Sequence, residues 1–526
     1  MKKIYYLLAC LFVLGSCFDD KGNYDYNPIN DVAIKGFGTL DTVYRGLYLI
    51  DTLHFRGELD CSLDKEVKDE NYIWRWELEK SIYEREIIAE TRNLDLPLNM
   101  TPGAYKLHLR VKDLATGIVH SVSESISVEL SYSKGLYILS DRENEEVQLD
   151  MVAIIESIGD TIILQDMLKE TDLPTLHRAI NVMHTGKDPN EETQRVWIMT
   201  EEGSYWLSSL TMQGNQNNTI WKMFATSLDV PSDAFPVDCW PKLAMGQESG
   251  NRTGYVRGFR LNDGSFIFSN ILVGELYSNP INRTRQQPQK LIRCFPSILY
   301  AARYLKSVIF FDMESRVFLG AQQPEYVPYI STITLLGLPK FRMDQKTYAH
   351  NRTCIYMENS RHPGDVDYSD RGRSYALMKD DIADYYIYAF YLGNNQFKAD
   401  LTAGYWKIKK DIATNLDQAT RYMFSSTRNQ LYYLVGGKVY CYSFNKDNER
   451  CEVVADFGTD EITWWDVDKW TEMTFDHIWV ATYNPATGGT LMKFREPQDQ
   501  NKLEWEKTST SWGGFPKIKS VSWRNC

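Results

Sequence analysis

Alternation of apolar and polar positions dominates the chain after residue 30 and predicts β-strands. The clearest runs in the first part of the chain are residues 72–78, 104–111 and 119–130. Each has the period of two that marks a sheet with one face in water. Turns that contain Pro or Gly separate these runs. We therefore expect residues 30–132 to form an antiparallel β-sandwich.

A second region, residues 133–526, repeats a different pattern, in which pairs of apolar or aromatic strands are joined by polar turns. About seven such units follow one another at a spacing of about 55 residues. The strand signals fall at residues 135–149, 195–207, 258–268, 307–319, 384–390, 430–442 and 477–494. This period predicts an all-β protein in which a seven-bladed β-propeller follows the sandwich. Two further sandwiches, or one large β-solenoid, are the alternatives. We also expect a short helix around residues 176–183.

The first 16 residues have the pattern of a signal peptide. Lys2 and Lys3 precede an apolar run, residues 4–14, that is too short to cross a bilayer. Two small residues then lead to Cys17, and this arrangement resembles the lipobox of bacterial lipoproteins. The resemblance implies cleavage before Cys17 and acylation of that residue, so that lipid chains alone hold the protein on a membrane. A secreted protein with a chance cysteine at the boundary is the alternative.

Residues 17–29 are expected to form a flexible tether after the acylated cysteine. Asp19 and Asp20 resemble the short acidic export signal that carries lipoproteins of the Bacteroides group across the outer membrane. A solvated linker explains the same polar composition. We expect the protein to be lipid-anchored at the outer membrane and to face the cell exterior.

The order of aromatic and turn residues in the predicted sandwich points to a family. Trp74-Arg75-Trp76 is followed by Pro102-Gly103 and then by the alternating strand 105–111, which resembles the immunoglobulin-like PKD-type fold. Together with the segment 19–26, the chain resembles the PKD-like lipoproteins of Bacteroides-type bacteria, which are found beside outer-membrane nutrient importers. The resemblance implies a TonB-dependent importer and its lipoprotein lid as partners, with the PKD-like domain as a spacer or a partner-binding module.

Composition narrows the range of ligands. The chain has 33 Tyr and 14 Trp, and its net charge of −12 argues against nucleic acid as a partner. Loops of a propeller surround the central channel, and an exposed indole there can stack on a sugar or hold a peptide side chain. We expect an oligosaccharide or an oligopeptide as the ligand, although each indole has packing between blades as its alternative role. The candidate ligand-binding residues are Trp240, Trp464, Trp465, Trp470 and Trp512.

Motifs for catalysis and for metal binding are weak in this sequence. It has no Gly-x-Ser-x-Gly, no His-Glu-x-x-His and no phosphate-binding Gly loop, and no cofactor is expected. Asp365, Asp367 and Asp370 are close enough for a calcium ion, but the run lacks the Gly and Glu of an EF-hand loop, which favours a solvated acidic loop. Cys441 and Cys451 flank a turn, so a cross-strand disulfide is an alternative to two small buried side chains.

Three classes of function follow from these observations. The first is a non-catalytic accessory subunit that binds a nutrient oligomer and docks on an importer. The second is a surface-anchored propeller enzyme, a glycan hydrolase or lyase, and the third is a structural adhesin or complex subunit. A shallow face of Trp and Tyr at the channel favours the first, whereas acidic, basic or His side chains converging there favour the second.

Overall fold

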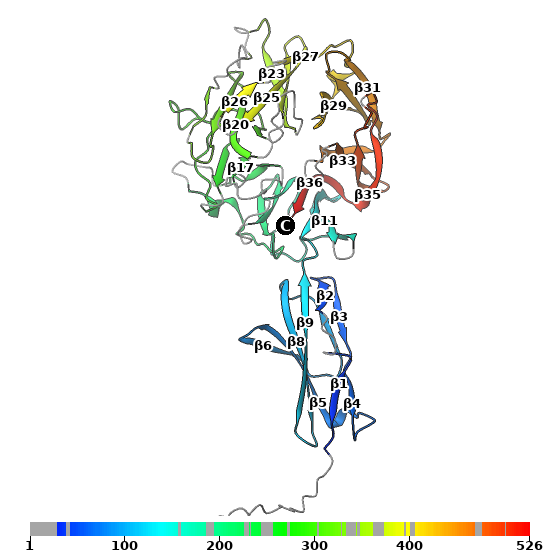
Figure 1. Ribbon diagram of the computed structural model, residues 1–526. Helices are drawn as coiled ribbons and strands as arrows, with labels where there is room; N and C mark the ends of the chain where they lie inside the picture. The colour runs from blue at the N-terminus through cyan, green and yellow to red at the C-terminus, as the bar shows by residue number, and fades with distance from the viewer. Residues whose placement is uncertain are drawn as a thin grey trace, which may run out of the picture. The chain divides into compact units, whose positions relative to one another are not determined.

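The computed structural model divides into two compact units, Met1–Ser131 and Tyr132–Cys526 (Figure 1). Its described part is all β apart from short 3-10 helices, which confirms the predicted fold class. In that part, no helix is both long and apolar enough to cross a membrane. The structure describes residues 29–37, 43–155, 159–185, 194–225, 231, 233–242, 256–270, 274–301, 304–327, 329–332, 343, 348–360, 373–393, 396–399, 405–468, 476–499 and 501–525.

The first unit is a β-sandwich. Its main sheet has the order β2-β9-β8-β5-β6, in which β2 runs parallel to β9 and the other neighbours are antiparallel. These strands are β2 (Val43–Leu47), β9 (Val119–Glu129), β8 (Gly103–Asp113), β5 (Tyr72–Ser81) and β6 (Glu84–Ala89). Two small sheets complete the unit, β1 (Val32–Lys35) with β4 (Glu58–Cys61) and β3 (Thr52–Phe55) with β7 (Leu94–Pro97).

Alternating residues of β5 fill the core of this sandwich. Trp74, Trp76 and Leu78 point inward, and the side chain of Trp76 is completely buried. The indole N–H of Trp76 donates a hydrogen bond to the backbone carbonyl of Thr91 at 2.9 Å. The ring of Phe37 packs edge-on against Trp76 at 5.2 Å between centroids. The period of two in the sequence thus places one apolar face of the sheet in the core.

The second unit is a β-propeller whose described residues form seven sheets around a ring (Figure 1). Blade 1 contains β10 (Lys134–Asp141), β11 (Val147–Ile155), β12 (Asp160–Leu164) and β36 (Lys517–Asn525). Blade 2 contains β13 (Ala179–His184), β14 (Arg195–Thr200) and β15 (Ser204–Ser208), and blade 3 contains β16 (Pro236–Trp240), β17 (Val256–Leu261) and β18 (Phe266–Asn270). Blade 4 contains β19 (Leu299–Ala301), β20 (Tyr304–Asp312), β21 (Val317–Gln322) and β22 (Ser331–Thr332).

The remaining blades continue in chain order. Blade 5 contains β23 (Arg352–Asn359), β24 (Ser374–Asp380), β25 (Tyr385–Gly393), β26 (Gln396–Ala399) and β27 (Tyr405–Lys407). Blade 6 contains β28 (Arg421–Phe424), β29 (Gln430–Val435), β30 (Lys438–Ser443) and β31 (Arg450–Asp456). Blade 7 contains β32 (Glu461–Val467), β33 (His477–Asn484), β34 (Gly488–Arg495) and β35 (Glu506–Phe515). Every strand signal of the sequence falls in a different blade, so the alternatives of further sandwiches and of a solenoid are wrong.

The blades are held together by apolar cores between neighbouring sheets. Between blades 5 and 6, for example, the rings of Tyr375 and Phe424 stack with their centroids 4.4 Å apart and both are buried. The core between blades 6 and 7 is built in the same way around Trp465, Ile478 and Val480. Since strands in the blades are covered on both faces, their sequences are apolar at most positions rather than strictly alternating.

A strand from the C-terminal part of the chain closes the ring. β36 pairs with β10 in antiparallel register, with Ile138 opposite Val521. The Ser520 hydroxyl accepts a hydrogen bond from the backbone N–H of Val182 at 3.2 Å and donates one to the Asn181 side-chain carbonyl at 2.6 Å. β36 therefore completes blade 1 and also binds the first strand of blade 2.

One local expectation is wrong, and one alternative is excluded. The segment expected to contain a helix at residues 176–183 instead contains the strand β13, because its backbone pairs with β14. Cys441 and Cys451 are both free thiols. Cys441 lies opposite Glu452 and Cys451 opposite Tyr442, so the two sulfurs point to opposite faces of blade 6 and cannot bond to each other.

Candidate functional site

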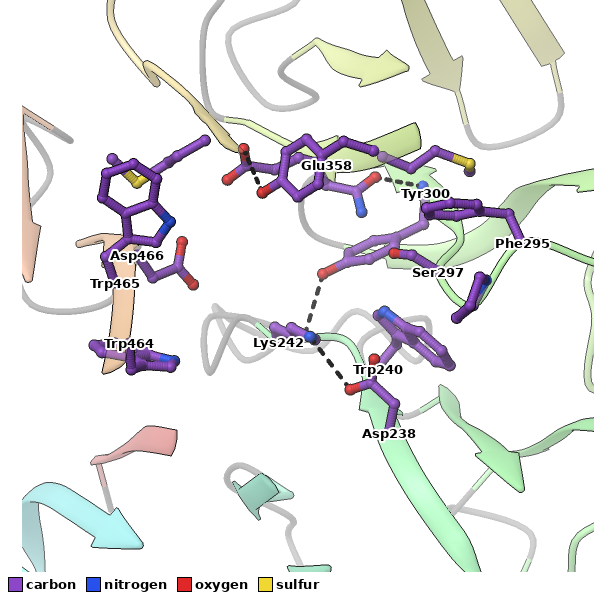
Figure 2. A pocket seen from close by; sticks show the side chains of 15 residues that line it. Asp238, Trp240, Lys242, Phe295, Ser297, Tyr300, Glu358, Trp464, Trp465 and Asp466 are labelled. Carbon is purple, nitrogen blue, oxygen red and sulfur yellow. Dashed lines mark hydrogen bonds and ion pairs between the residues drawn. The ribbon is translucent and has the colours of Figure 1, made fainter. Parts of the chain in front are cut away.

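The first strands of blades 3 to 7 line a pocket of about 320 Å³ in the ring (Figure 2). These strands lie beside one another around the centre, and β19, for example, contacts β23, which contacts β28. The lining contains six aromatic residues, Trp240, Phe295, Tyr300, Tyr356, Trp464 and Trp465. It also contains Asp238, Lys242, Ser297, Glu358, Asn359 and Asp466, together with Pro296, Met357 and Met423.

Three of the lining strands carry an aromatic residue and a carboxylate two positions apart. The pairs are Asp238 with Trp240 in β16, Tyr356 with Glu358 in β23, and Trp464 with Asp466 in β32. Residues two apart in a strand point to the same side. Blades 3, 5 and 7 therefore each present a ring and an acid side by side to the pocket.

A β-bulge precedes each of these pairs. The register of the inner strand with its neighbour shifts between Pro236 and Asp238, between Cys354 and Tyr356, and between Ile462 and Trp464. A bulge inserts one residue into a strand and redirects the side chains that follow it. The three bulges thus explain how strands that are otherwise packed between blades turn a ring and an acid toward the pocket.

On the blade 3 side, the pair is fixed by contacts within the pocket wall. The Trp240 side chain is 1% exposed and its ring stacks on Phe266 at 5.8 Å between centroids. Asp238 Oδ1 accepts a hydrogen bond from the Asn181 side-chain amide at 2.9 Å and lies 3.2 Å from Lys242 Nζ. The Asp238 carboxylate is therefore held in one orientation with a cation beside it.

Tyr300 and Asn359 join blades 4 and 5 below the pocket surface. The Tyr300 backbone N–H donates to Asn359 Oδ1 at 2.6 Å, and the Asn359 amide donates to the Ile298 carbonyl at 3.0 Å. The Tyr300 hydroxyl accepts from the backbone N–H of Lys242 at 3.1 Å. These bonds link blades 3, 4 and 5, so the tyrosine ring is positioned before any ligand binds.

The Glu358 carboxylate is fixed between blades 5 and 6. Its Oε2 accepts hydrogen bonds from the Tyr356 hydroxyl at 3.1 Å and from the backbone N–H of Phe424 at 2.6 Å. Burial, followed by the negative charges of Glu358 and Asp466, raises the pKa of Tyr356 well above its usual value. Tyr356 therefore stays a neutral phenol whose hydroxyl donates a hydrogen bond to Glu358.

The two adjacent tryptophans of β32 have different surroundings. Trp465 is buried in the core between blades 6 and 7, with its ring 6.3 Å from that of Trp505. Trp464 is half-buried and packs on the edge of the core between blades 7 and 1. Figure 2 shows Trp464, Trp465 and Asp466 on one side of the pocket and Trp240, Tyr300 and Phe295 on the other.

The candidate residues from the sequence have different positions in the structure. The structure brings Trp240, Trp464 and Trp465 together in the pocket. Trp512 lies in β35, outside the lining, and stacks on Trp479 at 5.9 Å between centroids. Cys17, Trp470, Asp365, Asp367 and Asp370 lie outside the described residues. Among the residues that the structure does describe, no three His, Cys, Asp or Glu side chains are grouped to hold a metal ion.

The sequence pattern does not mark five of the lining residues as site residues: Asp238, Lys242, Tyr300, Tyr356 and Glu358. They stand in or beside strands whose other positions are apolar, so nothing local marks them. The spacing of an aromatic residue and an acid two positions apart, repeated in three inner strands, is the one signal that identifies most of them.

A family model matches the N-terminal end of the chain. Residues 17–172 match the PKD-like family, and this match extends past Ser131 into the first blade. Comparison with curated proteins finds no match.

Solved structures with a similar fold include two from Bacteroides. A quinonprotein alcohol dehydrogenase-like protein from Bacteroides thetaiotaomicron has 12% identity over 94% of this chain and 99% of its own, with a TM-score of 0.39. A DUF4784 family protein from Bacteroides caccae has 7% identity over 94% of this chain and 99% of its own, with a TM-score of 0.31.

The β-propeller domain of the Trilobed protease from Pyrococcus furiosus has 8% identity over 77% of this chain and 87% of its own, with a TM-score of 0.26. Likenesses at this level carry no argument about activity. The chain therefore combines a PKD-like region at its N-terminal end with a β-propeller.

Proposed function

We propose that this protein is a non-catalytic, lipid-anchored accessory subunit at the outer membrane. It faces the cell exterior and captures a nutrient oligomer, a glycan or a peptide, in the pocket lined by blades 3 to 7. It delivers this ligand to a TonB-dependent importer and its lipoprotein lid. The lipobox-like segment before Cys17, the acidic residues after it and the PKD-like match over residues 17–172 support the anchor and the partners.

The observation that carries the binding role is the repeated ring and carboxylate in blades 3, 5 and 7. A flat apolar face of a ligand stacks on the half-buried rings of Tyr356 and Trp464, while a neighbouring donor group hydrogen-bonds to the acid. The buried ring of Trp240 supports the pocket wall. Sugars combine C–H faces with hydroxyl donors, and peptides combine apolar side chains with amide and cationic donors. Both ligand classes therefore suit these pairs, and three pairs spread around one pocket suit an oligomer better than a single small molecule.

Binding and co-purification test this proposal. Purified protein is titrated by calorimetry with a panel of oligosaccharides and oligopeptides, and saturable binding to members of one class is expected. Importer subunits should also be recovered with the protein from outer membranes in mild detergent. Lack of binding to either class contradicts the capture role, and recovery of the protein alone contradicts the partnership.

The three carboxylates of the same pocket favour a second candidate function, a surface-anchored glycan hydrolase or lyase. Glu358 is the best placed of them to act on a substrate, because two hydrogen bonds fix its orientation at the pocket wall. An enzyme would convert members of the glycan panel into shorter products detectable by mass spectrometry. Glu358→Gln would then abolish conversion while leaving binding measurable, whereas intact glycans after prolonged incubation exclude this candidate.

A further inference from the structure

One end of the first unit carries a cluster of exposed apolar side chains, which we name the apolar end. Its members have exposed fractions between 43% and 65%. They come from the start of the described chain, the loop after β4, the start of β5 and the turn between β8 and β9 (Figure 1). The cluster consists of Ile29, Leu63, Ile73, Leu114, Ile118 and Val119.

Hydrogen bonds show that these segments meet at one place. The Asn30 side-chain amide donates to the Tyr72 hydroxyl at 3.1 Å, while its carbonyl accepts from the backbone N–H of Leu63 at 3.1 Å. The backbone N–H of Leu114 donates to the carbonyl of Asn71 at 3.0 Å. Asn30 therefore fixes the point where the chain enters the sandwich to the same end as the apolar loops.

The apolar end continues onto the outer face of the main sheet. Ile73, Lys112 and Val119 stand opposite one another in β5, β8 and β9. Leu114 and Ile118 flank the tip of the turn that follows β8, a position that polar residues usually occupy. Several large apolar side chains exposed at one end of a domain favour a surface that another body covers.

Charged side chains of both signs surround the apolar end. The neighbouring cations are Lys65, Lys68, Arg92 and Lys112, and the neighbouring acids are Asp31, Asp64, Glu66, Asp69 and Glu70. Since the acids slightly outnumber the cations, this surface offers no cationic patch to an anionic partner. A partner that covers this surface therefore binds through apolar contacts. The long lysine side chains can extend their ammonium groups past the apolar side chains.

We propose that the apolar end rests on the lipid surface of the membrane to which the chain is anchored. The inference depends on the proposed function, because it takes Cys17 as the lipid-bearing residue. Residues 18–28 separate Cys17 from Ile29 and span at most about 40 Å when fully extended. The apolar end is thus the first folded surface after the anchor, and its Leu, Ile and Val side chains enter the boundary between headgroups and acyl chains.

A fluorescent probe at the turn tests this contact. Leu114→Cys carries a thiol-linked NBD group in the mature acylated protein, which is reconstituted into phosphatidylethanolamine/phosphatidylglycerol vesicles with or without doxyl-labelled lipid. Ile50→Cys is the matched control. Ile50 is 44% exposed, similar to Ile118, and its turn adjoins the Glu129 end of β9, opposite to the Val119 end. The wild-type protein carried through the same labelling measures the background from native thiols.

The probe at position 114 should lose at least about half its emission in doxyl-labelled vesicles, since interfacial side chains insert about 5–10 Å. The probe at position 50 should be unaffected. Raising the salt concentration should weaken neither result, because the apolar end offers no cationic patch to the anionic headgroups. An unquenched probe at position 114 on protein that floats with the vesicles overturns the inference while the anchor stands.

Two other outcomes are also informative. Protein that fails to float with the vesicles shows that the anchor itself is absent, which contradicts the proposed function and removes the basis of this inference. A probe at position 114 that is shielded only in native outer membranes, and not in vesicles of lipid alone, shows that a membrane protein covers the apolar end and overturns the lipid contact.

Discussion

Replacing Trp464 and Trp465 separately by alanine distinguishes ligand binding from packing. The two residues are adjacent in β32, yet Trp464 is half-buried at the pocket while Trp465 lies in the core beside Trp505. We expect Trp464→Ala to weaken ligand binding with little loss of stability. We expect Trp465→Ala to destabilise the propeller, whatever it does to the ligand.

The sizes of these effects follow from the areas involved. A tryptophan that contacts a ligand with one face contributes about 60–80 Å² of apolar area, or about 1.5–2 kcal/mol at about 25 cal/mol per Å². Loss of that contact weakens binding by about 10-fold to 30-fold. Removal of a large buried aromatic side chain costs about 3–5 kcal/mol of unfolding free energy, because a cavity remains in its place.

Calorimetric titration with the best ligand of the panel, together with thermal unfolding, measures both effects. Trp221→Ala serves as the control, because Trp221 is 36% exposed, contacts Phe224 with its ring tilted at 55° and lies outside the pocket. It should bind the ligand as the wild type does. If Trp464→Ala binds as tightly as Trp221→Ala, the pocket is not the capture site. If Trp465→Ala melts at the wild-type temperature, the packing argument for β32 is wrong.

Three further predictions concern the propeller itself. Ser520→Ala removes the side-chain acceptor of a backbone N–H in β13 and should cost about 1–3 kcal/mol, seen as a lower melting temperature, whereas Ser511→Ala on exposed β35 should change stability by less than about 0.5 kcal/mol. Burial and then two nearby arginines lower the pKa of His184 well below its usual value. The neutral ring of His184 makes its full contribution to stability above about pH 6.5. This contribution is lost as the pH falls, because His184 takes up a proton in the unfolded chain but not in the folded one. His184→Gln should therefore flatten the fall in melting temperature between about pH 7 and pH 5, and an unchanged slope contradicts this assignment. Burial raises the pKa of both Cys441 and Cys451. Both thiols should be alkylated in urea without prior reduction, as measured by mass spectrometry. If the two cysteines are alkylated only after reduction, they form a disulfide and this prediction is wrong.

Much of the fold follows from local pattern, because each blade contains a hairpin whose two strands are close in sequence. The pairing of the closing strand does not follow from local pattern. β36 pairs with β10, which lies at the other end of the propeller region in the sequence, and Ile138 stands opposite Val521. The helix expected at residues 176–183 fails for a related reason. Leu176, Ala179, Ile180 and Met183 are spaced as on one side of a helix, but pairing with β14 outweighs this weak local preference.

The candidate site is harder to predict from the sequence than the fold, because its residues come together only when the ring of blades closes. Its lining extends from Asp238 to Asp466 and draws only a few residues from each of five blades. Tryptophans in polar surroundings were conspicuous in the sequence, so three of them were found. A carboxylate such as Glu358 is not conspicuous in the sequence, because its position depends on Phe424 in the next blade, which donates one of its hydrogen bonds.

The position of the ring and acid pairs explains why a propeller can change its ligand without changing its fold. Each inner strand is held between neighbouring blades by its apolar side chains, while some residues after its bulge, such as Trp464 and Asp466, are only half-buried and line the pocket. In blade 3 the acid Asp238 comes directly after the bulge and its ring, Trp240, follows. In blades 5 and 7 the ring comes first and the acids, Glu358 and Asp466, follow it. Substitution at one such place mainly alters one wall of the pocket, although Asp238 and Glu358 also accept hydrogen bonds from Asn181 and Phe424 in neighbouring blades. Under the proposed function, ligand selectivity depends on these few positions, and exchange of them one blade at a time is the direct way to measure it.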